Sequence, residues 1–197
     1  GSFWSTQTQT NSPSSTARPM TLNNTDPNSS GVSIVNNSKI TFANAGVYNI
    51  QFSAQFENTG GGGSGETVNI WLKLNGTNVV ESDGKVTIAQ SNKFALPAWN
   101  YVLKLNAGDY VELYASANNA NVQLTALPTQ TTPTRPSAPS LIVVFKQVGV
   151  AVGSSSGSSG TSGSSGSSGT SGSSGTSGSS GSSGTSGSSG TSGSSGS

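Results

Sequence analysis

The sequence predicts an all-β head, an antiparallel β-sandwich or jelly roll, followed by an extended glycine-rich stalk. Short segments alternate apolar and polar residues with the period of a strand, and no stretch shows helical periodicity. Composition also changes abruptly, because residues 153–197 contain only glycine, serine and threonine. A segment without apolar side chains cannot form a hydrophobic core. We therefore expect a folded head at residues 1–152 and a stalk at residues 153–197.

Two segments give the clearest strand signals. Within Tyr48–Phe56 every even position is apolar and every odd position is polar, which predicts a strand with one face in the core. Val68–Leu74 alternates in a similar way and ends at Asn75-Gly76. Because this pair accepts the positive φ angles of a tight turn, we expect a hairpin there.

Six further segments are predicted as strands, separated by loops that contain Asn, Gly and Pro. They are Val32–Val35, Lys39–Phe42, Trp99–Leu105, Tyr110–Ala117, Val122–Leu127 and Leu141–Val148. About eight short strands without intervening helices indicate a sandwich or a jelly roll, and the spacing does not choose between them. Pro128–Pro139 is expected to be a long surface loop before the last strand.

Several segments resemble the C1q/TNF-like jelly rolls. Lys39–Tyr48 resembles the family's strand, turn and Gly-x-Tyr sequence, and Trp71–Gly76 resembles its Asn-Gly hairpin. Leu105–Val111 is similar to its Gly-Asp turn, and Leu141–Val148 to its apolar closing strand. The resemblance implies a jelly roll that forms homotrimers. The cysteine-free composition, rich in Asn, Thr and Ser, resembles phage or bacterial fibre heads in particular.

Six residues carry this resemblance: Gly46, Tyr48, Asn75, Gly76, Gly108 and Asp109. Gly46 and Gly108 are expected to form tight turns that a Cβ would strain, and Asp109 to hydrogen-bond the backbone of its turn. Tyr48 is expected to start a strand. We interpret these residues as fold markers and not as a ligand site.

The stalk has a collagen-like period. From Gly157 to Gly196 glycine occupies every third position, as a collagen triple helix requires. Because the stalk lacks proline, which preorganises such a helix, a flexible linker stays open as the alternative. An extended stalk would reach on the order of 120 Å. Candidate sites of O-linked sugar in the stalk are Thr161, Thr170, Thr176, Thr185 and Thr191.

The composition excludes several kinds of chemistry. Without histidine or cysteine, the chain cannot build a Ser-His triad, a cysteine nucleophile, or an imidazole or thiolate metal site. Eight basic and seven acidic residues nearly cancel, so neither nucleic acid nor an anionic membrane is an expected partner. Glu81 and Asp83 are close in sequence but lack the ligand density of a calcium loop. We expect no enzyme activity, no cofactor, no metal and no membrane insertion.

Two functions fit these observations. The favoured one is a structural subunit of an extracellular or virion fibre, which self-assembles through a trimeric head and an extended stalk. The alternative is a carbohydrate-binding adhesin or receptor-binding fibre head on a flexible linker, with Trp71 and Trp99 stacking on surface glycans. Trp99 shares strand parity with Leu103 and is expected in the core instead.

Overall fold

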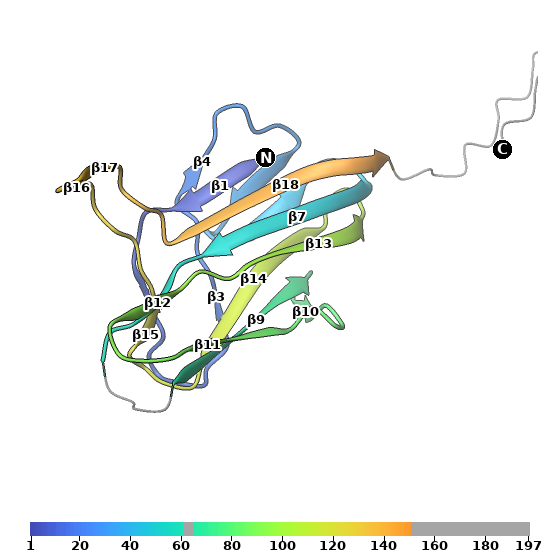
Figure 1. The fold of residues 1–197 in the computed structure, drawn as a ribbon. Helices are drawn as coiled ribbons and strands as arrows, with labels where there is room; N and C mark the ends of the chain where they lie inside the picture. The colour runs from blue at the N-terminus through green and yellow to red at the C-terminus, as the bar shows by residue number, and fades with distance from the viewer. Residues whose placement is uncertain (61–64, 151–197) are drawn as a thin grey trace, which may run out of the picture. The chain divides into compact units, whose positions relative to one another are not determined.

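Two main antiparallel β-sheets pack across a shared hydrophobic core in the computed structural model, which describes residues 1–60 and 65–150 (Figure 1). The five-stranded sheet has the order β13 (Ala98–Leu105), β7 (Gly46–Ala54), β18 (Leu141–Val150), β1 (Ser2–Ser5), β4 (Asn24–Thr25). The seven-stranded sheet has the order β10 (Thr77–Asn78), β9 (Glu66–Leu74), β14 (Tyr110–Ala117), β6 (Lys39–Phe42), β5 (Val32–Val35). In that sheet β11 (Gly84–Ile88) also pairs with β9, and β3 (Arg18–Pro19) with β14.

The described residues also form two smaller sheets. One has the order β12 (Lys93–Ala95), β8 (Phe56–Asn58), β15 (Val122–Leu124), β2 (Gln9–Thr10), and the other is the short hairpin β16 (Gln130–Thr131) and β17 (Thr134–Arg135). That hairpin lies within the predicted loop Pro128–Pro139. The predicted stalk and its five threonines lie outside the described residues.

The order in which the chain visits the two main sheets defines the fold. β6 lies in the seven-stranded sheet, β7 in the five-stranded sheet, β9 in the seven-stranded one and β13 in the five-stranded one. β14 and β18 continue this alternation. Strands that cross repeatedly between two antiparallel sheets form a jelly roll. The all-β prediction is confirmed, and the strand order selects the jelly roll from the two architectures that the sequence left open.

The alternation of Tyr48–Phe56 continues through a break in the strand. Even positions of β7 are buried as predicted, but β7 ends at Ala54, and Phe56 starts β8 in another sheet. At Gln55 the backbone N–H donates to the Ser140 carbonyl and the carbonyl accepts from the Thr125 N–H, both at 2.8 Å. The prediction of one continuous strand was therefore wrong, because Gln55 bonds to loops and not to the β7 ladder.

Most other strand predictions are confirmed. β5, β6 and β14 have the predicted bounds, whereas β9, β13 and β18 extend one to two residues further. The predicted strand Val122–Leu127 was too long, since β15 stops at Leu124. Thr125 then turns toward Gln55, and Leu127 forms an isolated bridge with Ala138.

Four strands before Val32 were not predicted. The most important is β1, which pairs with β18 on one side and with β4 on the other. Its Phe3 is fully buried and lies edge-on to Phe145, with ring centroids 6.1 Å apart. Phe145 in turn contacts Phe42 across the core at 5.4 Å, so β1 completes an aromatic cluster between the sheets.

In the described part of the chain, no helix is long and apolar enough to cross a membrane.

Candidate functional site

Four of the predicted fold markers meet at one end of the seven-stranded sheet. Asn75 and Gly76 form the β9–β10 turn with φ angles of 50° and 83°, as a two-residue hairpin requires. The Asn75 side chain then ties this turn to the β13–β14 connection. Its Nδ2 donates to Asp109 Oδ1 at 2.8 Å, and its Oδ1 accepts from the Tyr110 backbone N–H at 2.9 Å.

Asp109 is held by the turn that contains it. Its Oδ2 accepts a 2.7 Å hydrogen bond from the Asn106 backbone N–H. This bond and the bond from Asn75 lower the pKa of the Asp109 carboxyl, because both stabilise the carboxylate. Gly108 precedes it with φ at 86°, in the left-handed region that favours glycine. The cluster uses its polar groups to connect two turns of the fold.

Gly46 and Tyr48 lie elsewhere, on β7. Gly46 begins the strand and does not form the tight turn that the sequence predicted. Glycine is required there because a Cβ would lie 2.7 Å from the Gly149 carbonyl oxygen and would also contact the Gln147 side chain. β18 approaches this closely at a register shift between Gln147 and Gly149. Tyr48 is buried, and its hydroxyl donates to the Asn44 carbonyl at 2.8 Å.

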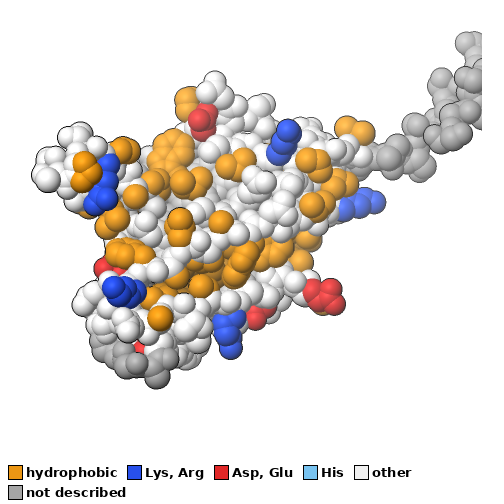
Figure 2. Space-filling view, in the orientation of Figure 1, with side chains coloured by type: hydrophobic (Ala, Val, Ile, Leu, Met, Phe, Trp, Pro, Cys, Tyr) orange, Lys and Arg blue, Asp and Glu red, His pale blue; other side chains and the backbone are white. Residues whose placement is uncertain are grey.

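The outer face of the five-stranded sheet is the candidate site for self-association. We call the outward-facing residues of β1, β7, β13 and β18 the assembly face. Val102, Ile142 and Val144 on this face expose 59%, 40% and 36% of their surface. Figure 2 shows apolar side chains gathered in a band over this sheet. Exposed aliphatic side chains that gather on one face are typical of an interaction surface.

A shallow hollow of about 400 Å³ lies on the assembly face between β13, β7 and β18. Strand register places Ala98, Ser53 and Ile142 side by side across the sheet, and Asn100, Gln51 and Val144 in the next outward row. The small side chains of Ala98 and Ser53 leave space beside Ile142. A hollow on an exposed sheet face gives a partner's side chains a place to pack.

Charges on the assembly face are few and lie toward one end. Its charged side chains are Lys104 and Lys146, which pair in register with Val47 and Asn49 near the start of β7. The rows that contain Ile142 and Val144 carry no charge. Depletion of charge is characteristic of the buried centre of protein interfaces. The sequence alone does not single out Val102, Ile142 and Val144, because the exposed side of a strand with mixed Asn, Gln, Ser and Val residues has no distinctive pattern.

The two tryptophans predicted for glycan binding lie on different sheets and point in different directions. Trp99 points into the sandwich and meets Phe52 edge-on at 5.5 Å. It was expected in the core, but it is only partly buried and packs against the core. Trp71 is on the outer face of β9, next to Tyr114 of β14. Trp71 lines a hollow on the outer face of the seven-stranded sheet, and Trp99 lines the hollow of the assembly face.

Glu81 and Asp83 line the same hollow as Trp71. Asp83 accepts hydrogen bonds from Asn69 Nδ2 on both carboxylate oxygens, at 2.9 and 3.2 Å. Within residues 1–60 and 65–150, no three Asp, Glu, His or Cys side chains are close enough together to hold a metal ion. The calcium loop considered for Glu81 and Asp83 therefore has no further acidic ligand there.

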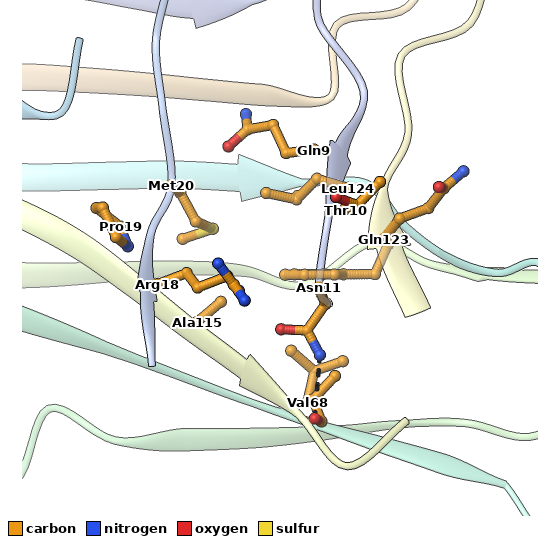
Figure 3. A pocket seen from close by; sticks show the side chains of 12 residues that line it. Gln9, Thr10, Asn11, Arg18, Pro19, Met20, Val68, Ala115, Gln123 and Leu124 are labelled. Atoms are coloured by element: carbon orange, nitrogen blue, oxygen red, sulfur yellow. Dashed lines mark hydrogen bonds between the residues drawn. The ribbon is translucent and has the colours of Figure 1, made fainter. Parts of the chain in front are cut away.

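A small cavity of about 60 Å³ lies beside the short strands β2 and β3 (Figure 3). Arg18 and Asn11 line it together with Met20 and Leu124. Asn11 Nδ2 donates to the Ala117 carbonyl at 3.0 Å, whereas the buried Nε of Arg18 has no hydrogen-bond partner in the described part of the chain. The volume corresponds to a few water molecules. The sequence does not indicate this cavity, since strands of two residues give no periodic signal.

The fold and the assembly face define an antiparallel jelly-roll β-sandwich with an apolar sheet face. No family model matches the chain. No curated protein matches it either. Among solved structures, murine APRIL at pH 5.0 aligns with 75% of this chain and 96% of its own, at 9% sequence identity and a TM-score of 0.48. The assignment to the jelly-roll class rests on the strand order described above and not on this likeness.

Proposed function

We propose that this protein is a structural subunit of an extracellular or virion fibre. Its jelly-roll head associates as a homotrimer through the assembly face, and residues 153–197 form an extended collagen-like stalk. The head provides the contacts between chains, and the stalk provides the length.

The assembly face carries this proposal. Burying Val102, Ile142 and Val144 between subunits would remove exposed apolar surface from water, at about 25 cal/mol for each Å². The rows around Ile142 and Val144 hold no charge that would have to be desolvated on assembly. β13 is also an edge strand of its sheet, and a partner that covers it would protect its unpaired backbone groups.

The stalk sequence supports the same proposal. Glycine at every third position suits three chains that share a crowded axis. A trimeric head would hold three stalks together, which reduces the entropy lost when they order. The Ser- and Thr-rich stalk would also present accessible hydroxyls for O-linked sugar, which the intact mass of native material would reveal.

Light scattering on the full chain tests the head interface. We expect a trimer for the native sequence and a monomer for the double variant Ile142→Asp/Val144→Asp, because six carboxylates would then face each other in one trimer. Val80→Asp is the matched control, since Val80 is 85% exposed and lies outside the assembly face. A monomeric native chain at micromolar concentration, or a trimeric double variant, would contradict the proposal.

An adhesin is the second candidate function. The hollow beside Trp71 favours it, because an aromatic ring for stacking and polar side chains for hydrogen bonds, such as Asn69 and Asp83, line it together. An adhesin activity is compatible with a fibre subunit, since fibres present heads at a distance from their attachment.

A further inference from the structure

The hollow beside Trp71 lies on the outer face of the seven-stranded sheet and has a volume of about 390 Å³. We call it the Trp71 hollow. Its lining includes Asn69, Trp71, Asn78, Glu81, Asp83 and Ser116. It combines one aromatic ring, two carboxylates, two amides and a hydroxyl. None of these groups is needed by the proposed assembly, because the hollow and the assembly face lie on different sheets.

The ring of Trp71 is held in place by two neighbours. Its Nε1–H donates to Asn78 Oδ1 at 3.0 Å, and its ring lies 5.8 Å from that of Tyr114, directly across from it on β14. Tyr114 is held in turn by Lys73, whose Nζ lies 4.1 Å from the ring centroid. Because these contacts fix its orientation, Trp71 offers a preorganised apolar surface to a ligand.

The polar groups of the hollow are also oriented. Asn69 Nδ2 donates to both oxygens of Asp83, which leaves further lone pairs of that carboxylate free to accept hydrogen bonds. Ser116 lies beside Asn69 in the strand register and adds a hydroxyl that donates or accepts. Asp83 is therefore a fixed acceptor, close to a fixed aromatic surface.

We propose that the Trp71 hollow binds an uncharged pyranose residue of a surface glycan. One face of a pyranose ring presents C–H groups that pack on an aromatic ring, and its neighbouring hydroxyls donate to a carboxylate. Trp71 supplies the first contact and Asp83 the second. Glu81 adds a second negative charge to the lining, so acidic sugars such as sialic acid are repelled.

Saturation-transfer NMR on the full chain tests this proposal. The probes are the methyl glycosides of glucose, galactose, mannose and N-acetylglucosamine, with sialyllactose as the acidic comparison. We expect at least one neutral glycoside to bind, and sialyllactose not to bind through its sialic acid. The Trp71→Ala and Asp83→Asn variants are each expected to weaken this binding about tenfold, by loss of stacking and of the charged acceptor.

Phe94→Ala is the matched control, because Phe94 is 48% exposed but does not line the hollow. Its binding should equal that of the native chain, and thermal unfolding should show that all variants are folded. Absence of binding to every neutral glycoside would overturn the proposal, as would binding that both hollow variants retain unchanged. The sugar site and the fibre function can fail separately. A monomeric chain that binds sugar would contradict the proposed trimer but not the proposed sugar site.

Discussion

At the scale of single residues, glycine serves two different physical needs in this head. Gly76 and Gly108 have positive φ angles in turns, a need that the sequence indicates through Asn-Gly and Gly-Asp pairs. Gly46 and Gly84 are required by space instead, because another segment approaches their Cα atoms closely. Close approach depends on residues that are distant in the sequence, so it was not predicted for either glycine.

Gly84→Ala is expected to destabilise the head by about 1–3 kcal/mol, the usual cost of overpacking. A Cβ at this position would lie 2.5–2.9 Å from three ring atoms of Trp99. Urea unfolding measures the change, with Gly149→Ala as the control because its Cβ would meet its nearest atom at 3.5 Å. Equal stabilities for the two variants would show that Trp99 moves aside without cost.

Asp109 is expected to make the free energy of unfolding of the head depend on pH. The pKa of its carboxyl is lowered in the folded state, so its contribution is fully present above the ordinary value of 3.8. The contribution is lost as the pH falls below that value and through the lowered pKa. Urea unfolding of the native chain and Asp109→Asn should show a stability difference that is constant near neutral pH and shrinks in this acidic range. A difference that stays unchanged down to pH 2 would contradict the assignment.

At the scale of elements, strand prediction succeeded where one face of a strand is buried. β7, β9 and β14 show period-two alternation, because the core side of each strand is mainly apolar, with the buried Glu66 at the start of β9 as an exception. The same pattern cannot show where a strand leaves its sheet, as the break at Gln55 demonstrates. It also fails for β1, which has only four residues, although β1 lies between β18 and β4.

Phe3→Ala is expected to destabilise the head by about 3–5 kcal/mol, as for other buried phenylalanines. Phe3 is fully buried and anchors β1 to the aromatic cluster of the core. Phe94→Ala removes the same side chain from a half-exposed position on β12 and should cost much less. Chemical unfolding of both variants measures this. A small loss for Phe3→Ala would mean that β1 is not an integral strand of the sheet.

At the scale of the whole molecule, the two main sheets present different chemistry to solvent. The five-stranded sheet carries the apolar assembly face, and the seven-stranded sheet carries the Trp71 hollow. Association through the assembly face would leave the Trp71 hollow accessible, because they lie on different sheets. A trimer would thus present three hollows, and a fibre would present more, so weak binding at each hollow would add up to strong attachment through multivalency.

Removing the stalk after Val152 is expected to leave the trimer intact, because the contacts proposed between subunits belong to the head. Circular dichroism of the full chain, after subtraction of the head spectrum, should show a polyproline-like signal that melts cooperatively if the stalk is a triple helix. Light scattering of the shortened chain gives its mass. A monomeric shortened chain would place the assembly contacts in the stalk, and a coil-like difference spectrum would favour the flexible linker.

The sequence by itself determined the all-β class, most strand positions, the Asn75-Gly76 turn and the period of the stalk. These features depend on neighbouring residues, through side-chain alternation, local φ preferences and composition. Only the tertiary structure decided the jelly-roll order, the place of β1, the role of Gly46, the assembly face and the grouping of Trp71 with Asp83. Each of these depends on which distant segments lie side by side. The alternation within a strand shows that one face is buried. It does not show which segment covers that face, or what contacts the exposed face.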